Sequence, residues 1–427
     1  MNEVSRLGNF LIRAVNRYGK FFTTSKLGAV DFDLARLLND AMRRARLYDF
    51  GTTDFLQPLS VLLDAYKKEA ELTLTGCIAM REDILQSLVT RLHIHAGRKR
   101  HPEIAEAGIE SPLFITGLPR SGTTFLHNLL AEDPGFRAPA GWEVMYPSPA
   151  PGVNTNGSDR RIARAQRRME QLYWLAPEFR VIHPLDASLP QECIAITSSA
   201  FVSDSYPTMC HVPSYQSWLD RAELTPSYEY HRRFLQHLQG GQRNLRWLLK
   251  APAHLFGLRS ILEVYPDARI IFMRRNPLEV LPSLANLTLV LRAAFSDRYE
   301  PEEIGHQLIW HWAEGMRQAR EFILQLPDHH TRCMEISYQD LTGQPLDTVA
   351  RLYRHFRLEL GNEALGRMRK YLRQRPKDQY GKHRYSLAQF GIDAGEIERA
   401  FAGMHSYCTG VVDCDEDTML YRITGNQ

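Results

Sequence analysis

Residues 117–124 constrain the fold of this chain more strongly than any other part of its sequence. They read Gly117-Leu118-Pro119-Arg120-Ser121-Gly122-Thr123-Thr124 and follow residues 111–117, a short apolar run typical of a buried parallel strand. A helix is expected directly afterwards, at 124–131. A glycine-bounded loop in this position turns backbone N–H groups and a helix N-terminus toward one point. A tight turn without a ligand is the alternative, but the arginine inside the loop favours a bound anion. The sequence therefore predicts a phosphate-binding loop.

Three further strand–helix units follow this loop. Each begins with a short apolar run, and a segment with helical periodicity comes after it. The expected strands are 244–250, 269–273 and 333–336, and the helices after them are 254–265, one ending near 291, and 346–356. Strands that alternate with helices predict an α/β fold, with a P-loop-type parallel β-sheet flanked by helices.

The N-terminal quarter has a different pattern. Apolar residues recur at helical spacing in three segments, 31–48, 55–70 and 75–95, without the alternation of a strand. The polar and basic stretch 96–111 is expected to be a linker. We therefore predict an N-terminal helical region, 1–105, and a main α/β domain, 106–427.

Charge and cysteine content exclude several classes of protein. The 52 Lys and Arg against 49 Asp and Glu leave a net charge of +3, too small for dedicated nucleic-acid binding. Six cysteines without a C-x-x-C pair argue against a zinc ribbon or disulfide scaffold and favour a reducing compartment. We find no signal-peptide pattern and no apolar run of about 18 residues, so we expect a cytoplasmic protein without a transmembrane helix. Residues 4–22 have the pattern of a basic amphipathic helix, which docks on the protein's own core or lies on a membrane surface.

The loop differs from the phosphate-binding loop of nucleotide triphosphatases. Thr123 stands where those enzymes carry a lysine, and the strand 269–273 lacks the acidic residue that helps to hold Mg²⁺. These differences predict a site that neutralises a phosphate-like group with side chains alone. A P-loop kinase or NTPase and a noncatalytic anion-binding module remain as alternatives.

The sequence resembles the sulfotransferases that use 3′-phosphoadenylyl sulfate (PAPS). Pro119-Arg120-Ser121-Gly122-Thr123-Thr124 is similar to the family's 5′-phosphosulfate loop, closest to the bacterial and tyrosylprotein-like branches. Arg275 and Ser283, eight residues apart, are similar to the pair that binds the 3′-phosphate. The resemblance covers roughly 111–400, and Asn276 departs from the family's usual aspartate. It implies a PAPS-dependent enzyme that needs no metal ion.

The resemblance also implies which residues bind the cofactor. The loop would hold the 5′-phosphosulfate, and Arg275 and Ser283 the 3′-phosphate. Lys382 belongs to 382–387, which takes the place of the family's lysine-bearing C-terminal loop, and Tyr338 follows the strand 333–336. The predicted cofactor-binding residues are Gly117, Pro119, Arg120, Ser121, Gly122, Thr123, Thr124, Arg275, Ser283, Tyr338 and Lys382.

Two cationic residues are predicted to stabilise the transferring sulfuryl group. Arg120 neutralises the phosphosulfate from within the loop. Lys250 ends the strand 244–250, where ligands bind in α/β proteins. The resemblance implies that this lysine acts on the bridging oxygen of the leaving group.

Two residues are candidates for the general base that deprotonates the acceptor hydroxyl. His183 resembles the base histidine of some branches, and a neutral imidazole suits this task near pH 7. Glu143 lies at a similar remove from the loop as the catalytic glutamate of tyrosylprotein sulfotransferases. Both stay open. Glu192 either orients His183 or caps the helix that follows it.

A hydroxyl group on a small, hydrophobic or phenolic molecule is the expected acceptor. Aromatic residues between 142 and 215 are predicted to line its pocket, with ordinary core packing as the alternative. They are Tyr146, Tyr173, Trp174, Phe201 and Tyr206. The basic run 160–168 is interpreted as a solvated helix face, with contact to an anionic ligand as the alternative. The sequence selects neither a particular acceptor nor an oligomeric state.

Overall fold

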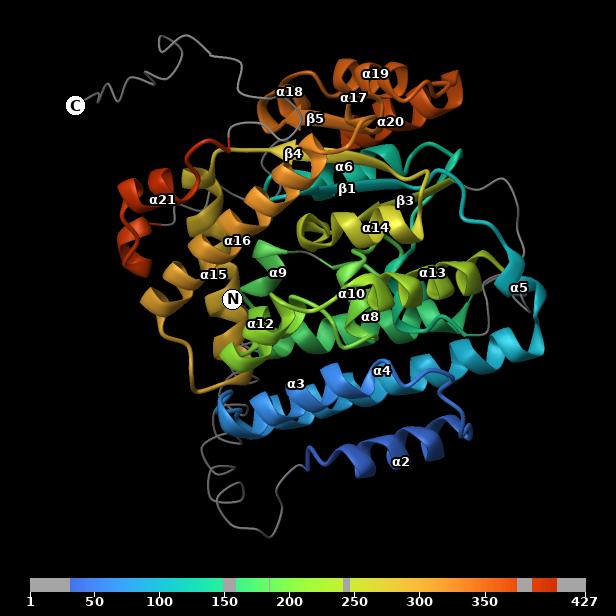
Figure 1. The fold of residues 1–427 in the computed structure, drawn as a ribbon, viewed down its shortest axis with the longest axis vertical. Coiled ribbons are helices and arrows are strands. Elements are labelled where there is room, and N and C mark those ends of the chain that lie inside the picture. The colour runs from blue at the N-terminus through green and yellow to red at the C-terminus, as the bar shows by residue number, and fades with distance from the viewer. Residues whose placement is uncertain (1–30, 149–158, 184, 241–245, 375–385, 405–427) are drawn as a thin grey trace.

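A five-stranded parallel sheet lies at the centre of the main domain (Figure 1). The computed structural model describes residues 31–148, 159–183, 185–240, 246–374 and 386–404. The strand order is β2-β3-β1-β4-β5, and every neighbouring pair is parallel. The strands are β1 (Leu113–Gly117), β2 (Phe136–Arg137), β3 (Arg246–Lys250), β4 (Arg269–Arg274) and β5 (Cys333–Ser337). The predicted fold class is confirmed. The two-residue edge strand β2 was missed because so short a segment carries no periodicity.

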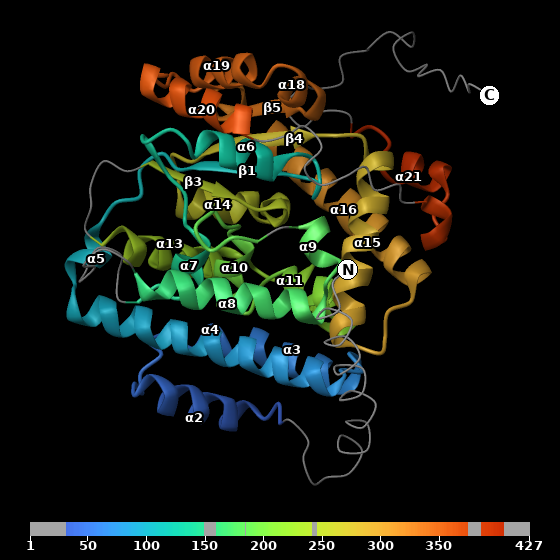
Figure 2. The same ribbon diagram turned by 180° about the vertical axis from the view of Figure 1, so that it is seen from behind.

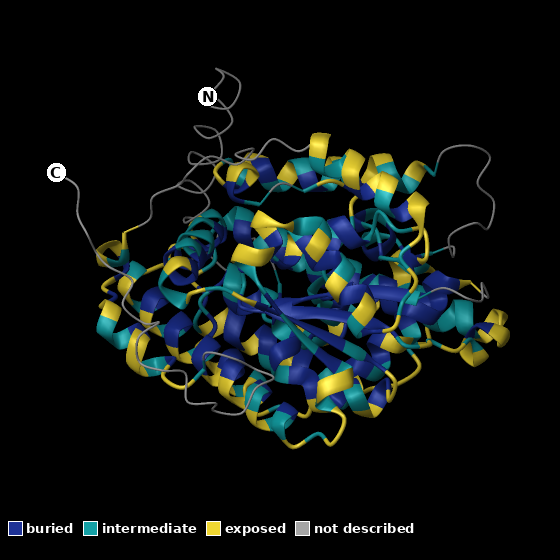
Figure 3. Ribbon diagram, turned by 90° about the horizontal axis from the view of Figure 1, so that it is seen from above, coloured by how far each residue is buried: buried dark blue, intermediate teal, exposed yellow. Residues whose placement is uncertain are grey.

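The alternation of side chains along the strands decides which helices cover which face of the sheet. Odd-numbered residues of β1, such as Leu113 and Ile115, pack with α6 (Thr123–Leu130), α19 (Pro345–His355) and α20 (Asn362–Gln374). Phe114 faces the other way, toward α13 (Thr225–Gln239), α14 (Leu258–Val264) and α16 (Pro301–Leu324). Helices therefore cover both faces and leave the strands buried, as Figure 3 shows from above.

The carboxyl ends of β1, β3 and β4 meet at one edge of the sheet. Ile115 pairs in register with Lys250, and Gly117 pairs with Met273. The chain runs from β1 to β2 and β3 on one side and then crosses to β4 on the other. Such a reversal of strand order opens a crevice in which α/β proteins bind ligands.

The remaining helices surround this core. Those before β3 are α2 (Leu34–Ala45), α3 (Leu56–Lys68), α4 (Leu74–Arg100), α5 (Glu103–Glu106), α7 (Gly141–Met145), α8 (Arg160–Leu175), α9 (Phe179–Ile182), α10 (Ile194–Ser198), α11 (Ser205–Met209) and α12 (Pro213–Leu219). Those after it are the 3₁₀ helix η1 (Pro252–Gly257), α15 (Pro277–Phe295), α17 (His329–Arg332), α18 (Tyr338–Gly343), the 3₁₀ helix η2 (Leu387–Phe390) and α21 (Ala394–Ala400).

The N-terminal helices form a layer on the far side of α8 from the sheet (Figure 2). Asp33 and Thr73 cap α2 and α4 through their side chains. The linker expected from residue 96 is wrong at its start, because α4 continues to Arg100 and Arg98 bonds Gln236 on α13 over 2.8 Å. Phe201, Tyr206, Tyr215 and Phe295 share one hydrophobic cluster with α2–α4. The domain boundary at residue 105 stays a prediction, and its two sides have this cluster in common.

Among the described helices, α15 alone has the length and mean hydropathy of a membrane span, 1.4 over 18 residues. Half of that window is buried inside the protein. Its buried Arg292 donates hydrogen bonds to the Pro207 carbonyl and to Gln307 on α16. These contacts are those of a core helix in a globular protein.

Candidate active site

The loop between β1 and α6 is held in a conformation that only glycine adopts easily at two of its positions. Gly117 has φ +133°, and a Cβ there would lie 2.3 Å from the Met273 carbonyl oxygen. Gly122 has φ +94°, and a Cβ there would lie 2.9 Å from the ring of Tyr338. The Oγ of Ser121 donates to the Leu118 carbonyl over 2.6 Å and closes the turn. Steric fit and backbone conformation therefore explain both glycines.

The second half of the sequence motif meets this loop in space. Arg120 donates from Nε to the Oγ of Ser283 over 3.1 Å and from Nη1 to the Ile182 carbonyl over 3.0 Å. Arg275 donates from Nη1 to the backbone carbonyl of Arg120 over 2.9 Å. Two guanidinium groups and a hydroxyl thus converge beside the N-terminus of α6, an arrangement suited to phosphate groups.

Arg275 is held by two further contacts. Its guanidinium lies 4.0 Å from the ring centre of Tyr338, and its Nε forms a 2.9 Å ion pair with Glu279 one helical turn away. The neighbouring Arg274 pairs instead with Glu335 on β5, over 2.7 Å. Of these two arginines, Arg275 is the one whose contacts reach the loop. Tyr338 packs against both the loop glycine and the arginine, and its role in cofactor binding stays a prediction.

Lys250 joins the loop to the partly buried carboxylate of Glu192. The lysine side chain is almost fully buried, and Nζ donates to the Thr124 Oγ1 over 3.1 Å and to Glu192. Burial opposes ionisation of Glu192, but the ammonium of Lys250 and the ring of His183 outweigh it and hold the pKa of Glu192 well below its usual range. The two contacts keep the lysine ammonium oriented between the loop and Glu192.

His183 follows α9 and extends this chain of contacts toward solvent. Its Nε2 lies 3.9 Å from the Oε1 of Glu192, and its ring stacks on Phe179 with 5.6 Å between ring centres. The side chain is 29% exposed, while Nδ1 is buried without a hydrogen-bond partner in the described part of the chain. Lys250, Glu192 and His183 thus form a continuous row from the loop to the surface.

Glu143 has a different environment from the one expected of a base. The residue is buried, and Oε1 accepts from Arg137 over 2.9 Å while Oε2 accepts from the backbone N–H of Ala140 over 2.9 Å. Both carboxylate oxygens therefore hold the start of α7 against β2. Of the two candidate bases, His183 is the one that contacts the Lys250–Glu192 pair.

Three of the aromatic residues predicted to line the acceptor pocket differ in how far they are buried. Phe201 and Tyr206 are fully buried in the hydrophobic cluster beneath α11 and α12, so their assignment to an acceptor pocket was wrong and the core alternative holds. Trp174 is 69% exposed on α8. Lys382 and residues 4–22 lie outside the described residues.

No set of three His, Cys, Asp or Glu side chains suited to a metal ion occurs in the described part of the chain.

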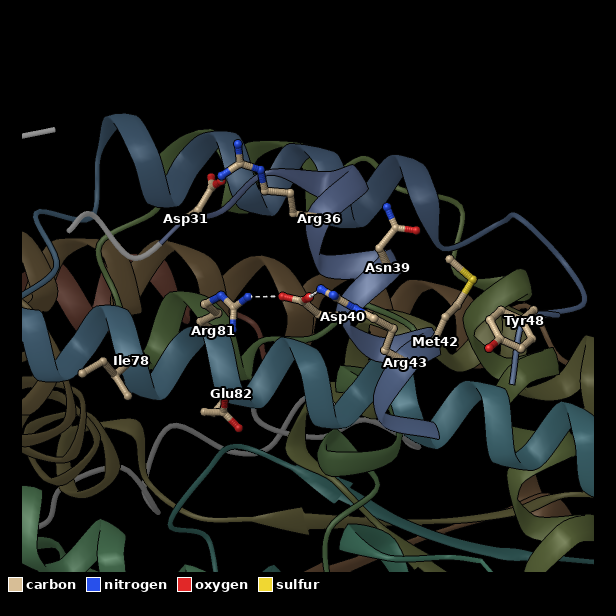
Figure 4. Close-up of a pocket in the computed structure, with 10 residues that line it drawn as sticks. All are labelled: Asp31, Arg36, Asn39, Asp40, Met42, Arg43, Tyr48, Ile78, Arg81 and Glu82. Carbon is tan, nitrogen blue, oxygen red and sulfur yellow. Dashed lines mark hydrogen bonds and ion pairs between the residues drawn. The ribbon is translucent and has the colours of Figure 1, made fainter. Parts of the chain in front are cut away.

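An open cavity of about 840 Å³ lies between α2 and α4, in the N-terminal layer (Figure 4). Asp40 pairs there with both Arg43 and Arg81, and Arg36 pairs with Asp31. Because its charges neutralise one another and it lies apart from the carboxyl edge of the sheet, we do not assign the reaction to it. Its lining is Asp31, Arg36, Asn39, Asp40, Met42, Arg43, Tyr48, Ile78, Arg81 and Glu82.

The fold and the site define a group-transfer enzyme of the sulfotransferase class. The sequence profile of the Sulfotransferase family matches residues 112–362, more than half of the chain, and the protein belongs to that family. It is a sulfotransferase enzyme, which decides against the kinase and noncatalytic alternatives.

Similar proteins come from mycobacteria. The chain is 29% identical over 283 residues to the omega-hydroxy-beta-dihydromenaquinone-9 sulfotransferase Stf3 of Mycobacterium bovis, covering 63% of this chain and 69% of that protein. The crystal structure of sulfotransferase STF1 from Mycobacterium tuberculosis H37Rv matches with a TM-score of 0.78 and 33% identity, over 87% of this chain and 98% of that one. Sulfotransferase STF9 from Mycobacterium avium matches with a TM-score of 0.80 and 26% identity, over 87% of this chain and 95% of that one.

Proposed function

We propose that this sulfotransferase moves a sulfuryl group from PAPS to the hydroxyl of a hydrophobic, lipid-like small molecule. The observation that carries the donor assignment is the meeting of Arg120, Arg275 and Ser283 beside the loop. Two arginines and a helix N-terminus fit a ligand with two separate phosphate-type groups. The acceptor class is suggested by the name of the mycobacterial relative Stf3, whose substrate is a hydroxylated menaquinone.

The residues of this chain divide between the two ends of the donor. Backbone N–H groups of 117–124 and the guanidinium of Arg120 would hold the 5′-phosphosulfate, and Arg275 and Ser283 the 3′-phosphate. Tyr338 would keep the Arg275 guanidinium in place through the contact of 4.0 Å. PAPS, when bound, supplies the sulfuryl group that is transferred.

Lys250, Glu192 and His183 would stabilise the developing charge and accept the proton of the acceptor. Lys250, held by Glu192 and Thr124, would neutralise the negative charge that develops on the leaving oxygen. His183, whose side chain is 29% exposed, would take the proton of the acceptor hydroxyl. Glu192, ionised through its contact with Lys250, would orient the imidazole and stabilise it once it is protonated.

A reducing, cytoplasmic setting is consistent with the cysteines. Cys193, Cys210 and Cys333 are buried and free in the described part of the chain, and Cys77 is half-buried and free. We therefore keep the cytoplasm as the proposed compartment.

Titration calorimetry tests the donor assignment. PAP, the desulfonated product, is expected to bind, while ATP and GTP bind at least tenfold more weakly. Arg275→Ala and Ser283→Ala are each expected to weaken PAP binding by about 10- to 100-fold, the usual effect of losing a charge-assisted hydrogen bond. Arg274→Ala is the matched control, because Arg274 pairs with β5 instead. Stronger binding of ATP than of PAP would refute the assignment.

A further inference from the structure

One face of α8 and the start of α9 carries a positively charged, partly aromatic surface beside the site. The residues at i, i+4, i+7, i+11 and i+14 of α8 all point outward, because one side of a helix repeats at this spacing. We name this surface the α8–α9 face. It consists of Arg160, Arg164, Arg167, Gln171, Trp174, Arg180 and Val181, each of which is exposed.

The opposite side of α8 is a buried apolar stripe. Ala165, Met169 and Tyr173, spaced four residues apart, face the protein and leave the arginines on the outside. Between residues 159 and 189, four arginines and two acidic residues, Glu178 and Asp186, are exposed among the described residues. The excess of positive charge on this surface is therefore not cancelled locally.

The same surface carries large exposed apolar side chains. Trp174 is 69% exposed and Val181 is 47% exposed. Leu189, eight residues further along the chain, is 46% exposed. An exposed tryptophan at the end of a row of arginines is the combination that proteins place at the boundary between lipid headgroups and acyl chains. The described residues of α20, which is also a basic helix, include no exposed large hydrophobic side chain.

The face ends at the candidate base. Trp174 is followed by α9, and His183 comes two residues after Val181. Tyr173 lies 6.3 Å from Phe179 between ring centres, and Phe179 stacks beneath His183. Leu189 lies in the segment that joins His183 to Glu192. Figure 2 shows α8 along the front of the molecule with α9 above one end of it.

We infer that the α8–α9 face docks on an anionic lipid surface and brings His183 to a hydroxyl acceptor dissolved in that membrane. Arginines attract the anionic headgroups, and Trp174 and Val181 enter the interface. This inference rests on the proposed function for the acceptor, but docking itself is independent of sulfuryl transfer. Four exposed arginines and one tryptophan give a reversible, salt-sensitive association of a peripheral protein rather than an anchor.

Co-sedimentation of the full chain with vesicles tests the inference. We expect binding to vesicles of phosphatidylcholine mixed with phosphatidylglycerol, little binding to phosphatidylcholine alone, and loss of binding at about 1 M salt. Arg164→Glu/Arg167→Glu is expected to weaken binding by at least 25-fold, since each arginine near an anionic surface contributes about fivefold. The matched control is Arg369→Glu/Arg373→Glu, two exposed arginines of α20 on the other side of the sheet.

A second measurement reports insertion of the tryptophan. Fluorescence quenching by brominated acyl chains is expected in the parent protein and lost in Trp174→Phe. Unchanged vesicle binding in the Arg164/Arg167 variant, or equal losses in both charge variants, would overturn the inference and point to contact elsewhere. No binding to anionic vesicles would overturn it as well, and an acidic protein would then be the better partner for these arginines.

The calorimetric PAP titration separates this inference from the proposed function. Variants of the α8–α9 face should bind PAP as the parent does, because none of their residues belongs to the site. Normal PAP binding with absent vesicle binding defeats the docking inference alone. Absent PAP binding with normal vesicle binding defeats the donor assignment alone.

Discussion

The Nε of Arg120 donates a hydrogen bond to the Oγ of Ser283 over 3.1 Å, although the two residues are 163 positions apart in the chain. The first belongs to the loop after β1 and the second to the first half of α15. The same arginine bonds the Ile182 carbonyl, directly before His183. One guanidinium therefore links the two halves of the predicted donor site to the end of α9, directly before the candidate base.

Glu279 neutralises Arg275 in this structure and would compete with a 3′-phosphate for it. The ion pair spans 2.9 Å, and the Glu279 side chain is 48% exposed, so its contribution is small. Glu279→Gln is expected to tighten PAP binding by about two- to fivefold in calorimetry. Glu363→Gln, which breaks the same type of pair with Arg367 on α20, is the control. Weaker PAP binding in Glu279→Gln would contradict this competition.

Removal of the Lys250 ammonium should affect catalysis and stability separately. We expect Lys250→Met to lower kcat by about 10²- to 10³-fold. The variant should also unfold more easily, by at most about 3–5 kcal/mol, because it leaves the partly buried Glu192 carboxylate without its partner. Lys250→Met/Glu192→Gln is expected to recover most of the stability but none of the activity. Denaturant titration and steady-state kinetics measure the two effects. If the double variant recovered both stability and activity, the lysine would have no catalytic role.

Substitution of the two candidate bases is expected to change the pH dependence of the reaction rate in different ways. His183→Gln is expected to lower kcat by about 10²- to 10⁴-fold and to remove the acidic limb of the rate profile. Glu143→Gln should leave that limb in place and lower the melting temperature, because it weakens the contacts with Arg137 and Ala140. The reverse pattern, with the limb lost in Glu143→Gln, would make the glutamate the base. Sulfate transfer to any accepted hydroxyl compound serves as the assay.

Buried histidines should make the protein sensitive to acid. Burial lowers the pKa of His231 to about 3, and burial together with Lys250 lowers the pKa of His127 to about 3. Because each folded pKa lies below its ordinary value of 6.5, the unfolded chain binds more protons at intermediate pH. The stabilising effect of the neutral rings is therefore present above pH 6.5 and is lost as the pH falls toward about 3.

Denaturant titration between pH 7 and about pH 4 measures this effect. Each buried histidine contributes a slope of at most about 1.4 kcal/mol per pH unit. His231→Gln is expected to be less stable at pH 7, since it loses the 2.8 Å hydrogen bond to Tyr265, but to depend less on pH. His330→Gln, which changes an exposed ring, is the control for the substitution itself. An unchanged slope in His231→Gln would mean that its ring does not stay neutral.

Much of the fold follows from patterns within short stretches of sequence. The apolar runs of β1, β3, β4 and β5 and the glycines of the loop are local signals, since burial and backbone conformation act on each residue where it stands. The family motif also placed Arg120, Arg275 and Ser283 in one predicted site, and their contacts agree with that arrangement. Helix ends were less predictable. The segment 254–265, expected as one helix, is η1 followed by α14, and contacts with α13 extend α4 to Arg100.

The sequence by itself thus determined the parallel α/β architecture, the glycine-bounded loop between β1 and α6, and the class of chemistry. Only the tertiary structure decided between residues with the same local pattern. It brings Glu192 and His183 to Lys250 while both oxygens of Glu143 are held by α7 and β2, and it buries Phe201 and Tyr206 while Trp174 stays exposed. The physical reason is that a side chain's charge partners and its exposure depend on neighbours distant in sequence, which periodicity does not record.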